Sequence, residues 1–483
     1  MFINDWSLRR AVNESQRFHL LIIFVLAGLL LFANLHVGGL SGYDDAFYAH
    51  EGRRMLASGD WWNVRFNGNL NFEYPPLFIW LEAASFSLFG ISDFTAKFPS
   101  ALLGLLTITL VFLLAKELSG NFWLPIISAW ILMLSQYFMK YAMHAMTDVP
   151  FVFFFTLAVF CYVKGLKNAN YFILCGIAAA LGMMTRSAIG LIPLALIFFH
   201  LIFAKRFALF RAPQLWAGLL LALAIPAAWY FPQYQAHGDR FLNEHFAFIT
   251  GKVASGKPFE LLAFLRGLLE YPWLLVKLYE PWVWLMLIGL TVHAKRAVRE
   301  KDSTSTLLCL WVFFVIVPFS FAEAKVLRYV LAAFPAFSIL AAAPLSDWLT
   351  AVKNRKNIAV VYGLFCLAII LIVAFPNPRY RAEEMMKMSP TIQANVPENR
   401  KIIFYTGKDT KFDFHNQLLW YADRFTEQLS DEEKLREKLH SKDKSIFVMD
   451  KTNFQLFSAD SRLRLQTLEE TENFVCFTNN ALD

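Results

Sequence analysis

Long apolar runs separated by short polar loops dominate the first 375 residues of the chain. All but one of these runs have about 18 residues or more, which is the length an α-helix needs to cross the hydrocarbon core of a bilayer. The pattern predicts eleven membrane spans, and hairpin-like splits of the longer runs would raise the number to thirteen. The expected spans are residues 18–37, 95–115, 122–140, 149–166, 170–185, 187–204, 214–231, 273–292, 305–322, 327–346 and 357–375.

The polar loops between these runs alternate in charge. Cytoplasmic loops of membrane proteins carry an excess of Lys and Arg, so the basic loops are assigned to the cytoplasm. The N-terminus is then cytoplasmic, and an odd number of spans places the C-terminus on the outer side. The cytoplasmic clusters are Arg9, Arg10, Arg17, Lys116, Lys164, Lys167, Lys205, Arg206, Arg211, Lys295, Arg296, Arg299, Lys301, Lys353, Arg355 and Lys356.

Residues 38–94 form a long loop on the outer side. Within it, residues 44–57 have the pattern of a short amphipathic helix with Asp44 or Asp45 at its N-cap. The apolar stretch 76–89 follows a Pro-Pro pair, carries Glu82 and is too short to cross the membrane. We therefore expect it to lie in the membrane interface. Residues 232–270 form a second outer loop.

Beyond Pro376 the composition becomes polar. Strand-like runs at 401–405, 445–449 and 473–477 alternate with helix-like runs at 416–422 and 431–440, which predicts a small α/β domain. The expected fold class is a polytopic α-helical membrane protein with about 11–13 spans. Residues 1–377 form its membrane domain, and residues 378–483 form a C-terminal α/β domain on the periplasmic side.

Composition excludes several classes of function. The chain is 57% hydrophobic and carries a net charge of +7, but much of the basic excess lies in the short cytoplasmic loops, so a nucleic acid is not an expected partner. The sequence has no P-loop, no Gly-rich dinucleotide turn and no zinc-protease motif. No dense row of charges lines the spans, which argues against a channel or a proton pump.

Carboxylates recur where outer loops meet the membrane. Asp44 and Asp45 follow the first span, Glu73 precedes the Pro-Pro pair, and Asp148 opens a later span. Each could be a helix cap or a solvated loop residue. A carboxylate at the membrane surface could also deprotonate a hydroxyl group of a lipid-borne substrate, because partial burial raises its pKa.

Basic residues on the outer side run against the charge trend. Lys325 and Arg328 flank the start of the span at 327, where they would either bind a lipid phosphate or extend towards the headgroups. Arg186 and Lys252 have the same two interpretations. His144 and the pair Glu244-His245 are candidate metal ligands, although isolated histidines are more often structural.

Several of these segments together resemble the GT-C glycosyltransferases, in the protein O-mannosyltransferase-like group that includes the lipid A aminoarabinose transferases. The resemblance covers most of residues 18–375. It is carried by Asp44-Asp45-Ala46-Phe47-Tyr48-Ala49, Arg53, residues 55–61, 72–77, 88–90, 97–102 and 115–120, Asp148, residues 182–186 and 241–245, and residues 325–335.

The resemblance implies a GT-C-like enzyme that transfers a sugar, with inversion, from a polyprenyl-phosphate donor such as an undecaprenyl phosphate sugar. The acceptor would be lipid A or lipopolysaccharide, an envelope glycan or a protein, reached from the periplasmic side of a bacterial inner membrane. Asp44 and Asp148 match the catalytic carboxylates of the family. The residues expected to bind substrate are Asp45, Arg53, Glu73, Tyr74, Lys325 and Arg328. No cofactor is required by the pattern, but a divalent metal cation at Glu73 and His245 is an alternative holder of the phosphate.

The sequence departs from the family pattern at four places. No Arg follows Glu244-His245 at the short spacing associated with a phosphate contact. Tyr74 stands where the aminoarabinose transferases carry Lys, and Thr185-Arg186-Ser187 replaces a Thr-Lys-Gly motif of relatives. The tail is also shorter. These departures leave the identity of the sugar open.

Two other classes of function remain. Carboxylates and cations could bind the headgroup of a lipid-linked sugar in a transporter or flippase, or the chain could be a non-catalytic membrane assembly subunit. Transporters usually concentrate their sites near the middle of the membrane, so the long outer loop favours the enzyme.

Overall fold

The protein forms two compact units in the computed structural model, which describes residues 3–42, 44–253, 261–320, 326–352, 362–364, 366–371, 382–405, 407, 413–441, 443–458 and 465–479. The membrane unit comprises residues 1–34, 72–78 and 98–376, and the loop–tail unit comprises residues 35–71, 79–97 and 377–483. The first outer loop, which the sequence suggested as part of the membrane domain, thus shares a compact unit with the C-terminal tail.

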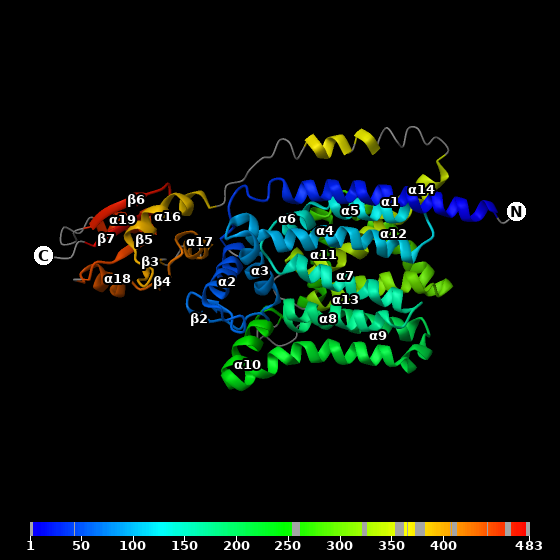
Figure 1. The fold of residues 1–483 in the computed structure, drawn as a ribbon, viewed down its shortest axis with the longest axis horizontal. Coiled ribbons are helices and arrows are strands. Elements are labelled where there is room, and N and C mark those ends of the chain that lie inside the picture. The colour runs from blue at the N-terminus through cyan, green and yellow to red at the C-terminus, as the bar shows by residue number, and fades with distance from the viewer. Residues whose placement is uncertain are drawn as a thin grey trace. The chain divides into compact units, whose positions relative to one another are not determined.

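Helices make up the membrane unit (Figure 1). Seven helices in the described part of the chain are long and apolar enough to cross a membrane, which confirms a polytopic helical membrane protein. The helices are α1 Ile3–Phe32, α4 Asp93–Leu118, α5 Trp123–Leu134, α6 Gln136–Ala142, α7 Asp148–Gly165, α8 Tyr171–Arg186, α9 Ile192–Phe203, α10 Pro213–Val253, α11 Leu261–Leu278, α12 Trp282–Lys295, α13 Ser303–Ser320 and α14 Phe334–Ala351, with short turns η1 Ser187–Leu191, η2 Phe207–Arg211, η3 Arg296–Glu300 and η4 Leu327–Ala333.

Small residues bring neighbouring helices close together. A Cβ atom on Gly176 of α8 would lie 1.9 Å from the carbonyl oxygen of Gly218 in α10, so this crossing has no room for a side chain. The same holds for Gly289 of α12, where a Cβ would lie 1.9 Å from the carbonyl oxygen of Leu340 in α14. Close backbone approach at small residues is typical of helix packing in membranes.

The helices differ from the predicted spans in several regions; for example, the expected span 122–140 is broken at Ser135 between α5 and α6. The expected span 273–292 is wrong, because α11 ends at Leu278 and α12 begins at Trp282. The expected loop from 232 is also wrong up to Val253, since α10 continues through it with one non-helical residue, Gly238. Its polar composition suggested a loop, but Phe241 and His245 lie one helical turn apart and are both buried, which stabilises the helix.

The first-loop part of the loop–tail unit contains α2 Asp45–Ser58, most of α3 Leu77–Phe89 and a small hairpin. Strands β1 Arg65–Phe66 and β2 Asn69–Leu70 pair antiparallel. The two turn residues Asn67 and Gly68 have φ angles of 48° and 83°, the left-handed conformations that a tight hairpin turn requires. The helix predicted over residues 44–57 is confirmed with a shift of one residue.

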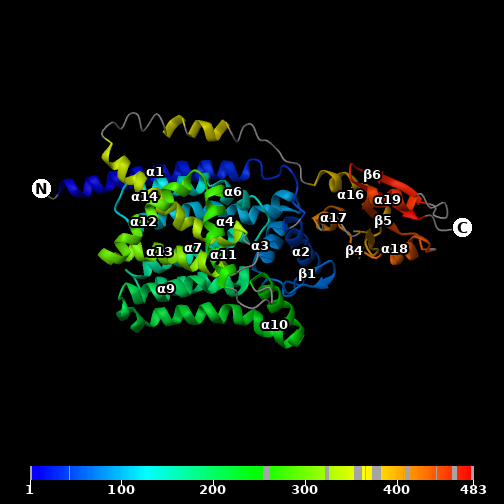
Figure 2. The same cartoon turned by 180° about the vertical axis from the view of Figure 1, so that it is seen from behind.

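The tail folds into the predicted α/β domain, a five-stranded sheet with helices on both faces (Figures 1 and 2). The strand order is β4-β3-β5-β7-β6, with β4, β3 and β5 parallel and β7 antiparallel to both β5 and β6. Side chains of α16 and α17 pack on one face of the sheet, and those of α18 and α19 pack on the other. The elements are α16 Glu383–Asn395, β3 Ile402–Tyr405, α17 Asp413–Ala422, β4 Thr426–Leu429, α18 Glu432–Leu439, β5 Ile446–Asp450, α19 Lys451–Ser458, β6 Leu465–Glu470 and β7 Phe474–Asn479.

Candidate active site

Asp44 is the N-cap residue of α2 and is partly exposed. Its side chain makes no capping hydrogen bond, although an aspartate at this position usually accepts one from the next turn. Its backbone carbonyl oxygen accepts the first helical bond, from the amide of Tyr48 at 3.0 Å. The structure therefore does not assign Asp44 the capping role that the sequence left open.

Asp45, the next residue, is completely buried. Its Oδ2 accepts a hydrogen bond from the amide of Ser41 at 3.1 Å, which closes the turn that precedes the helix. This contact is a local structural one, and the predicted contact of Asp45 with the substrate stays a prediction. The two adjacent carboxylates differ in role because one faces inward and the other is partly exposed.

Two further buried carboxyl groups are found here: Glu51 belongs to α2, and Glu82 of α3 packs against that helix. Glu51 accepts a hydrogen bond from the side-chain amide of Asn71 at 2.6 Å. Glu82 of α3 packs against Gly52, where an added Cβ would lie 2.9 Å from the Cβ of Glu82. Burial, together with the neighbouring charges of Glu51 and Asp45, raises the pKa of the Glu82 carboxyl well above its usual range.

His50 lies on the same helix but is not suited to proton transfer at neutral pH. Burial and the nearby guanidinium of Arg54 lower the pKa of His50 to about 3. Its Nε2 accepts the amide of Asn67 at 3.3 Å. His50 therefore remains neutral, and Asp44 is the partly exposed acid–base candidate at this end of α2.

Arg53 contacts the tail domain. Its guanidinium donates to the carboxylate of Asp423 and to the carbonyl oxygen of Trp420, the latter at 3.2 Å. Arg54 donates to the other carboxylate oxygen of Asp423. Both cations thus form ion pairs within the loop–tail unit, and the predicted contact of Arg53 with the substrate stays a prediction.

In the membrane unit, Asp148 and Arg186 form a buried ion pair. Nη1 of Arg186 lies 2.5 Å from Oδ1 of Asp148. Asp148 opens α7 and Arg186 ends α8, so the pair joins the ends of two neighbouring helices. A buried carboxylate of this kind is compatible with a role in binding or orienting a charged substrate, and it also stabilises the helix ends.

The chain reverses immediately after Arg186. Ser187 has φ 58° and ψ −143°, a conformation that almost only glycine adopts without strain. This turn starts η1 and directs Arg186 back towards Asp148. A glycine at this position would adopt the same backbone conformation without cost.

Arg328 lies at the start of η4 and is half-buried, with its guanidinium 5.9 Å from the ring centre of Tyr329. The phenol of Tyr141 is subject to the fields of both Asp148 and Arg328. Burial, Tyr137 and Asp148 raise the pKa of Tyr141, and the charge of Arg328 opposes that shift. Arg328 thus shares a neighbourhood with the Asp148 ion pair.

Lys140 adds a second cation to this neighbourhood, with its ammonium group 5.4 Å from the ring centre of Tyr141. No sequence signal singles out Lys140 or Tyr141, because Lys140 ends a predicted span and resembles any residue at a membrane boundary. Lys325, predicted as the partner of Arg328, lies outside the described residues.

The predicted metal site is not supported by the residues described. Nδ1 of His245 lies 2.6 Å from the carbonyl oxygen of Phe72, and Nε2 lies 2.9 Å from the hydroxyl of Tyr230. Both ring nitrogens are therefore engaged in hydrogen bonds. Glu73 and Tyr74 follow Phe72 and are partly buried. Among the described parts of the chain, no group of three His, Cys, Asp or Glu side chains could hold a metal ion.

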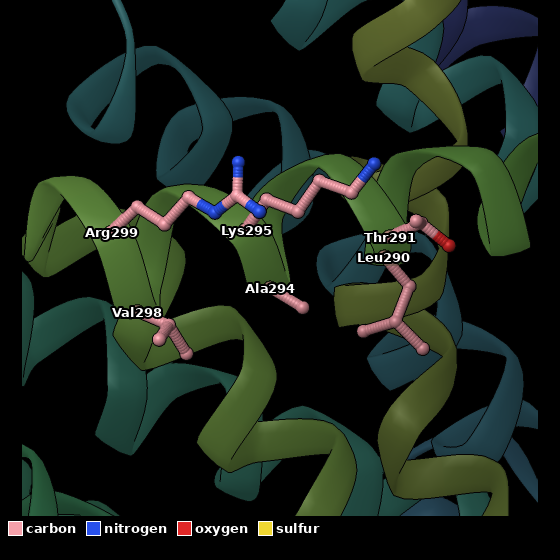
Figure 3. Close-up of a pocket in the computed structure, with 6 residues that line it drawn as sticks. All are labelled: Leu290, Thr291, Ala294, Lys295, Val298 and Arg299. Carbon is pink, nitrogen blue, oxygen red and sulfur yellow. The ribbon is translucent and has the colours of Figure 1, made fainter.

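A pocket of about 440 Å³ lies along α12 and η3 (Figure 3). It is lined by Leu290, Thr291, Ala294, Lys295, Val298 and Arg299. These residues belong to a segment that the charge pattern places at the cytoplasmic end of the helices. The pocket contains no carboxylate, so it does not match the chemistry expected of the active site.

Comparisons with known proteins agree with this arrangement. Residues 73–231 match the family described as dolichyl-phosphate-mannose-protein mannosyltransferase. An uncharacterized protein of Aquifex aeolicus is 28% identical over 357 residues, covering 72% of this chain and 67% of that protein. An undecaprenyl phosphate-alpha-4-amino-4-deoxy-L-arabinose arabinosyl transferase of Pseudomonas fluorescens is 26% identical over 390 residues, covering 76% of this chain and 67% of the relative.

The fold is also similar to a solved structure, that of ArnT from Cupriavidus metallidurans bound to undecaprenyl phosphate. The TM-score is 0.75 at 17% sequence identity, and the match covers 95% of this chain and 97% of ArnT. The chain is thus similar in sequence and fold to the GT-C glycosyltransferases, and in particular to the lipid A aminoarabinose transferases. It is a multi-pass membrane glycosyltransferase.

Proposed function

We propose that the protein transfers a sugar from a polyprenyl-phosphate donor to an acceptor at the outer face of the bacterial inner membrane. The observation that carries this proposal is the partly exposed carboxylate of Asp44 at the start of α2, next to the fully buried Asp45. The names of the relatives and the undecaprenyl phosphate bound to ArnT support the class of donor.

In the proposed reaction, an acceptor oxygen attacks the anomeric carbon of the sugar. The bond between that carbon and the phosphate oxygen breaks, a new carbon–oxygen bond forms with inversion, and polyprenyl phosphate leaves. Asp44 accepts the proton of an acceptor hydroxyl group, which requires a carboxylate that is close to the substrate and ionised. If the acceptor is a phosphate, as on lipid A, Asp44 orients it instead.

The leaving phosphate gains negative charge in the transition state, so a fixed cation there lowers the barrier. Arg328 is the candidate in the described part of the membrane unit, and Lys325 is the candidate from the sequence. Asp148 forms an ion pair with Arg186, and the charges of Asp148 and Arg328 both act on Tyr141. A divalent cation remains the alternative holder of the phosphate, although His245 is hydrogen-bonded through both nitrogens.

The acceptor is proposed to be lipid A or lipopolysaccharide, an envelope glycan or a periplasmic protein. The charge pattern of the loops supports a cytoplasmic N-terminus and a periplasmic tail. A reporter fused after Asp483 should then be active in the periplasm. Cytoplasmic activity of that fusion would place the carboxylates on the wrong side of the membrane for this reaction.

The test uses the full-length protein in lipid nanodiscs with an undecaprenyl phosphate sugar donor. Release of undecaprenyl phosphate should depend on the protein and on Asp44. A flippase would move the donor without releasing undecaprenyl phosphate, and an assembly subunit would do neither. Mass spectrometry of lipid A, envelope glycans and periplasmic proteins, from cells with and without the protein, would identify the sugar and the acceptor.

A further inference from the structure

Helix α17 of the tail domain contacts the first outer loop at several separate points. One is Leu40, which lies four residues before Asp44 and is completely buried. Its amide donates to the hydroxyl of Tyr421 at 2.7 Å, and its carbonyl oxygen accepts from Nε2 of Gln417 at 2.9 Å. Two side chains of one tail helix therefore satisfy both polar groups of a single residue in the approach to Asp44.

Tyr421 also connects this segment to the start of α4. Its hydroxyl donates to Oδ2 of Asp93 at 2.9 Å, while Nε1 of Trp420 donates to Oδ1 of the same carboxylate at 2.9 Å. The tyrosine hydroxyl thus donates one hydrogen bond and accepts another, which is its full complement in this geometry. Burial and the charge of Asp93 raise the pKa of Tyr421, so the phenol remains protonated.

A second set of contacts holds the helix that follows Asp44. Arg53 and Arg54 of α2 both donate to the carboxylate of Asp423, which lies directly after α17. These side chains are only about one-fifth exposed, at 21% for each arginine and 23% for the aspartate. Charge-assisted bonds from two donors to one partly buried carboxylate are stronger than surface ion pairs.

The hairpin after α2 is attached to the tail as well. Asn67 donates through Nδ2 to the carbonyl oxygen of Thr426 at 3.0 Å, and its Oδ1 accepts the amide of Thr426 at the same distance. The paired bonds fix the start of β4 against the turn of the hairpin. The first loop is therefore bound to the tail before Asp44, along α2 and beyond it.

These contacts lead to Asp44 through a short path. Leu40 precedes Ser41, whose amide donates to Asp45 and whose carbonyl oxygen accepts the amide of Ala46 at 3.2 Å. Fixing Leu40 therefore fixes the turn in which Asp44 lies. Misplacing a reacting group by about 1 Å can cost on the order of 100-fold in rate.

We propose that the tail domain is the positioning device for Asp44, and that Tyr421 and Asp423 are positioning residues for sugar transfer. The proposal rests on the proposed function for its effect on the reaction. The expected effect on the conformation of the first outer loop rests only on the contacts described above. Tyr421 fixes the turn that leads to Asp44, and Asp423 fixes the helix that follows it.

The first experiment compares Tyr421→Phe with Tyr405→Phe in the full-length protein. Both changes remove a single hydroxyl group from the tail domain. Burial and neighbouring charges, and no hydrogen bond from a described residue, act on the phenol of Tyr405. We expect Tyr421→Phe to lower kcat roughly tenfold while KM for the donor changes by less than about twofold, because only the reacting geometry is lost. Tyr405→Phe should transfer sugar at the wild-type rate.

The second experiment tests the ion pair with Asp423→Asn and Asp423→Glu. The matched control is Glu427→Gln, which removes one charge from the neighbouring strand, where Glu427 pairs with Lys438 at 3.0 Å on a more exposed surface. We expect Asp423→Asn to lower kcat by roughly threefold to tenfold and Asp423→Glu to recover part of the loss. Glu427→Gln should have no effect.

Hydrogen exchange of the amides of Ala46 and Tyr48 gives a readout that needs no substrate. Exchange should be faster in Tyr421→Phe and Asp423→Asn, and unchanged in both controls. If the wild type releases no polyprenyl phosphate but exchange responds in this way, the proposed function fails and the positioning role holds. If both variants exchange at the wild-type rate, the positioning role is overturned whatever the activity. If the wild type is active and both variants have the same kcat as the controls, the positioning role is overturned as well.

Discussion

Arg186 donates a hydrogen bond from Nη1 to Oδ1 of Asp148 over 2.5 Å, and both side chains are buried. Removing one partner leaves the other as a buried charge without its counterion, which typically costs about 3–5 kcal/mol. We therefore expect Asp148→Asn and Arg186→Gln each to lower the thermal unfolding temperature of the purified protein clearly. The double variant should lose less than the sum of the two single losses.

The control for this pair is Glu117→Gln. Glu117 pairs with Lys164 and Lys167 on a more exposed surface, where such contacts contribute at most about 1 kcal/mol. Equal unfolding temperatures for Asp148→Asn and Glu117→Gln would contradict the assignment of Asp148 and Arg186 as a buried structural pair.

Ser187 provides a prediction of increased stability. Its φ of 58° and ψ of −143° strain a residue with a Cβ atom, whereas glycine adopts them freely. Ser187→Gly should stabilise the protein by about 1 kcal/mol, measured as a higher unfolding temperature. Ser187→Ala keeps the Cβ and should give no gain. A gain of similar size in both variants would show that loss of the buried hydroxyl, and not the backbone, is responsible.

Asp44→Asn separates catalysis from helix capping. Because the Asp44 side chain makes no capping hydrogen bond, the change should leave the unfolding temperature near that of the wild type. Loss of the general base should lower sugar transfer by about 100-fold or more. Asp45→Asn should reduce transfer less, since Asp45 is buried in the turn. Near-normal transfer by Asp44→Asn would remove Asp44 from the mechanism.

The buried carboxyl group of Glu82 should make the stability of the folded protein depend on pH. Its pKa is raised in the folded protein by burial and by Glu51 and Asp45, so the folded state binds the proton more tightly than the unfolded state. The contribution of Glu82 to stability is therefore fully present below the unfolded pKa of about 4.3 and is lost as the pH rises towards the folded pKa. Glu82→Gln cannot ionise.

Glu82→Gln should thus unfold at a higher temperature than the wild type at neutral pH, and the difference should shrink as the pH falls towards about 4.3. Unfolding curves measured across this range would provide the test. A difference that is constant with pH would mean that Glu82 does not change its protonation state on folding.

The phosphate of the donor provides the last prediction. Arg328→Ala or Lys325→Ala should weaken use of the donor by about 1.5–3 kcal/mol if each cation makes a charge-assisted contact. Tyr74→Lys should recover part of that loss, since it adds a positive charge at the position where the family resemblance implies Lys. The control is Lys295→Ala, because the charge pattern of the loops assigns Lys295 to the cytoplasmic side. If both variants transfer sugar at the wild-type rate and a chelator abolishes activity, the donor phosphate is bound by a metal ion.

The sequence alone determined the local elements of this protein. The length and spacing of apolar runs predicted the membrane helices, because an α-helix in lipid must satisfy its own backbone hydrogen bonds. Period-two and helical patterns located β3, β5, β7, α17 and α18 to within a few residues. Asp44 and Asp148 were found because carboxylates are rare at the edges of apolar segments. Each of these signals lies within a short stretch of chain.

The tertiary structure alone decided which side chains meet. Asp423 pairs with Arg53, which is 370 positions away in the sequence, and Asp148 pairs with Arg186 across two helices. Glu82 is completely buried beneath α2, although the sequence placed it in an interfacial helix. Such partners cannot be read from local patterns, because whether a charge is solvated, paired or buried depends on packing between segments distant in the chain. The same packing separates Asp44, which is partly exposed, from Asp45, which is buried.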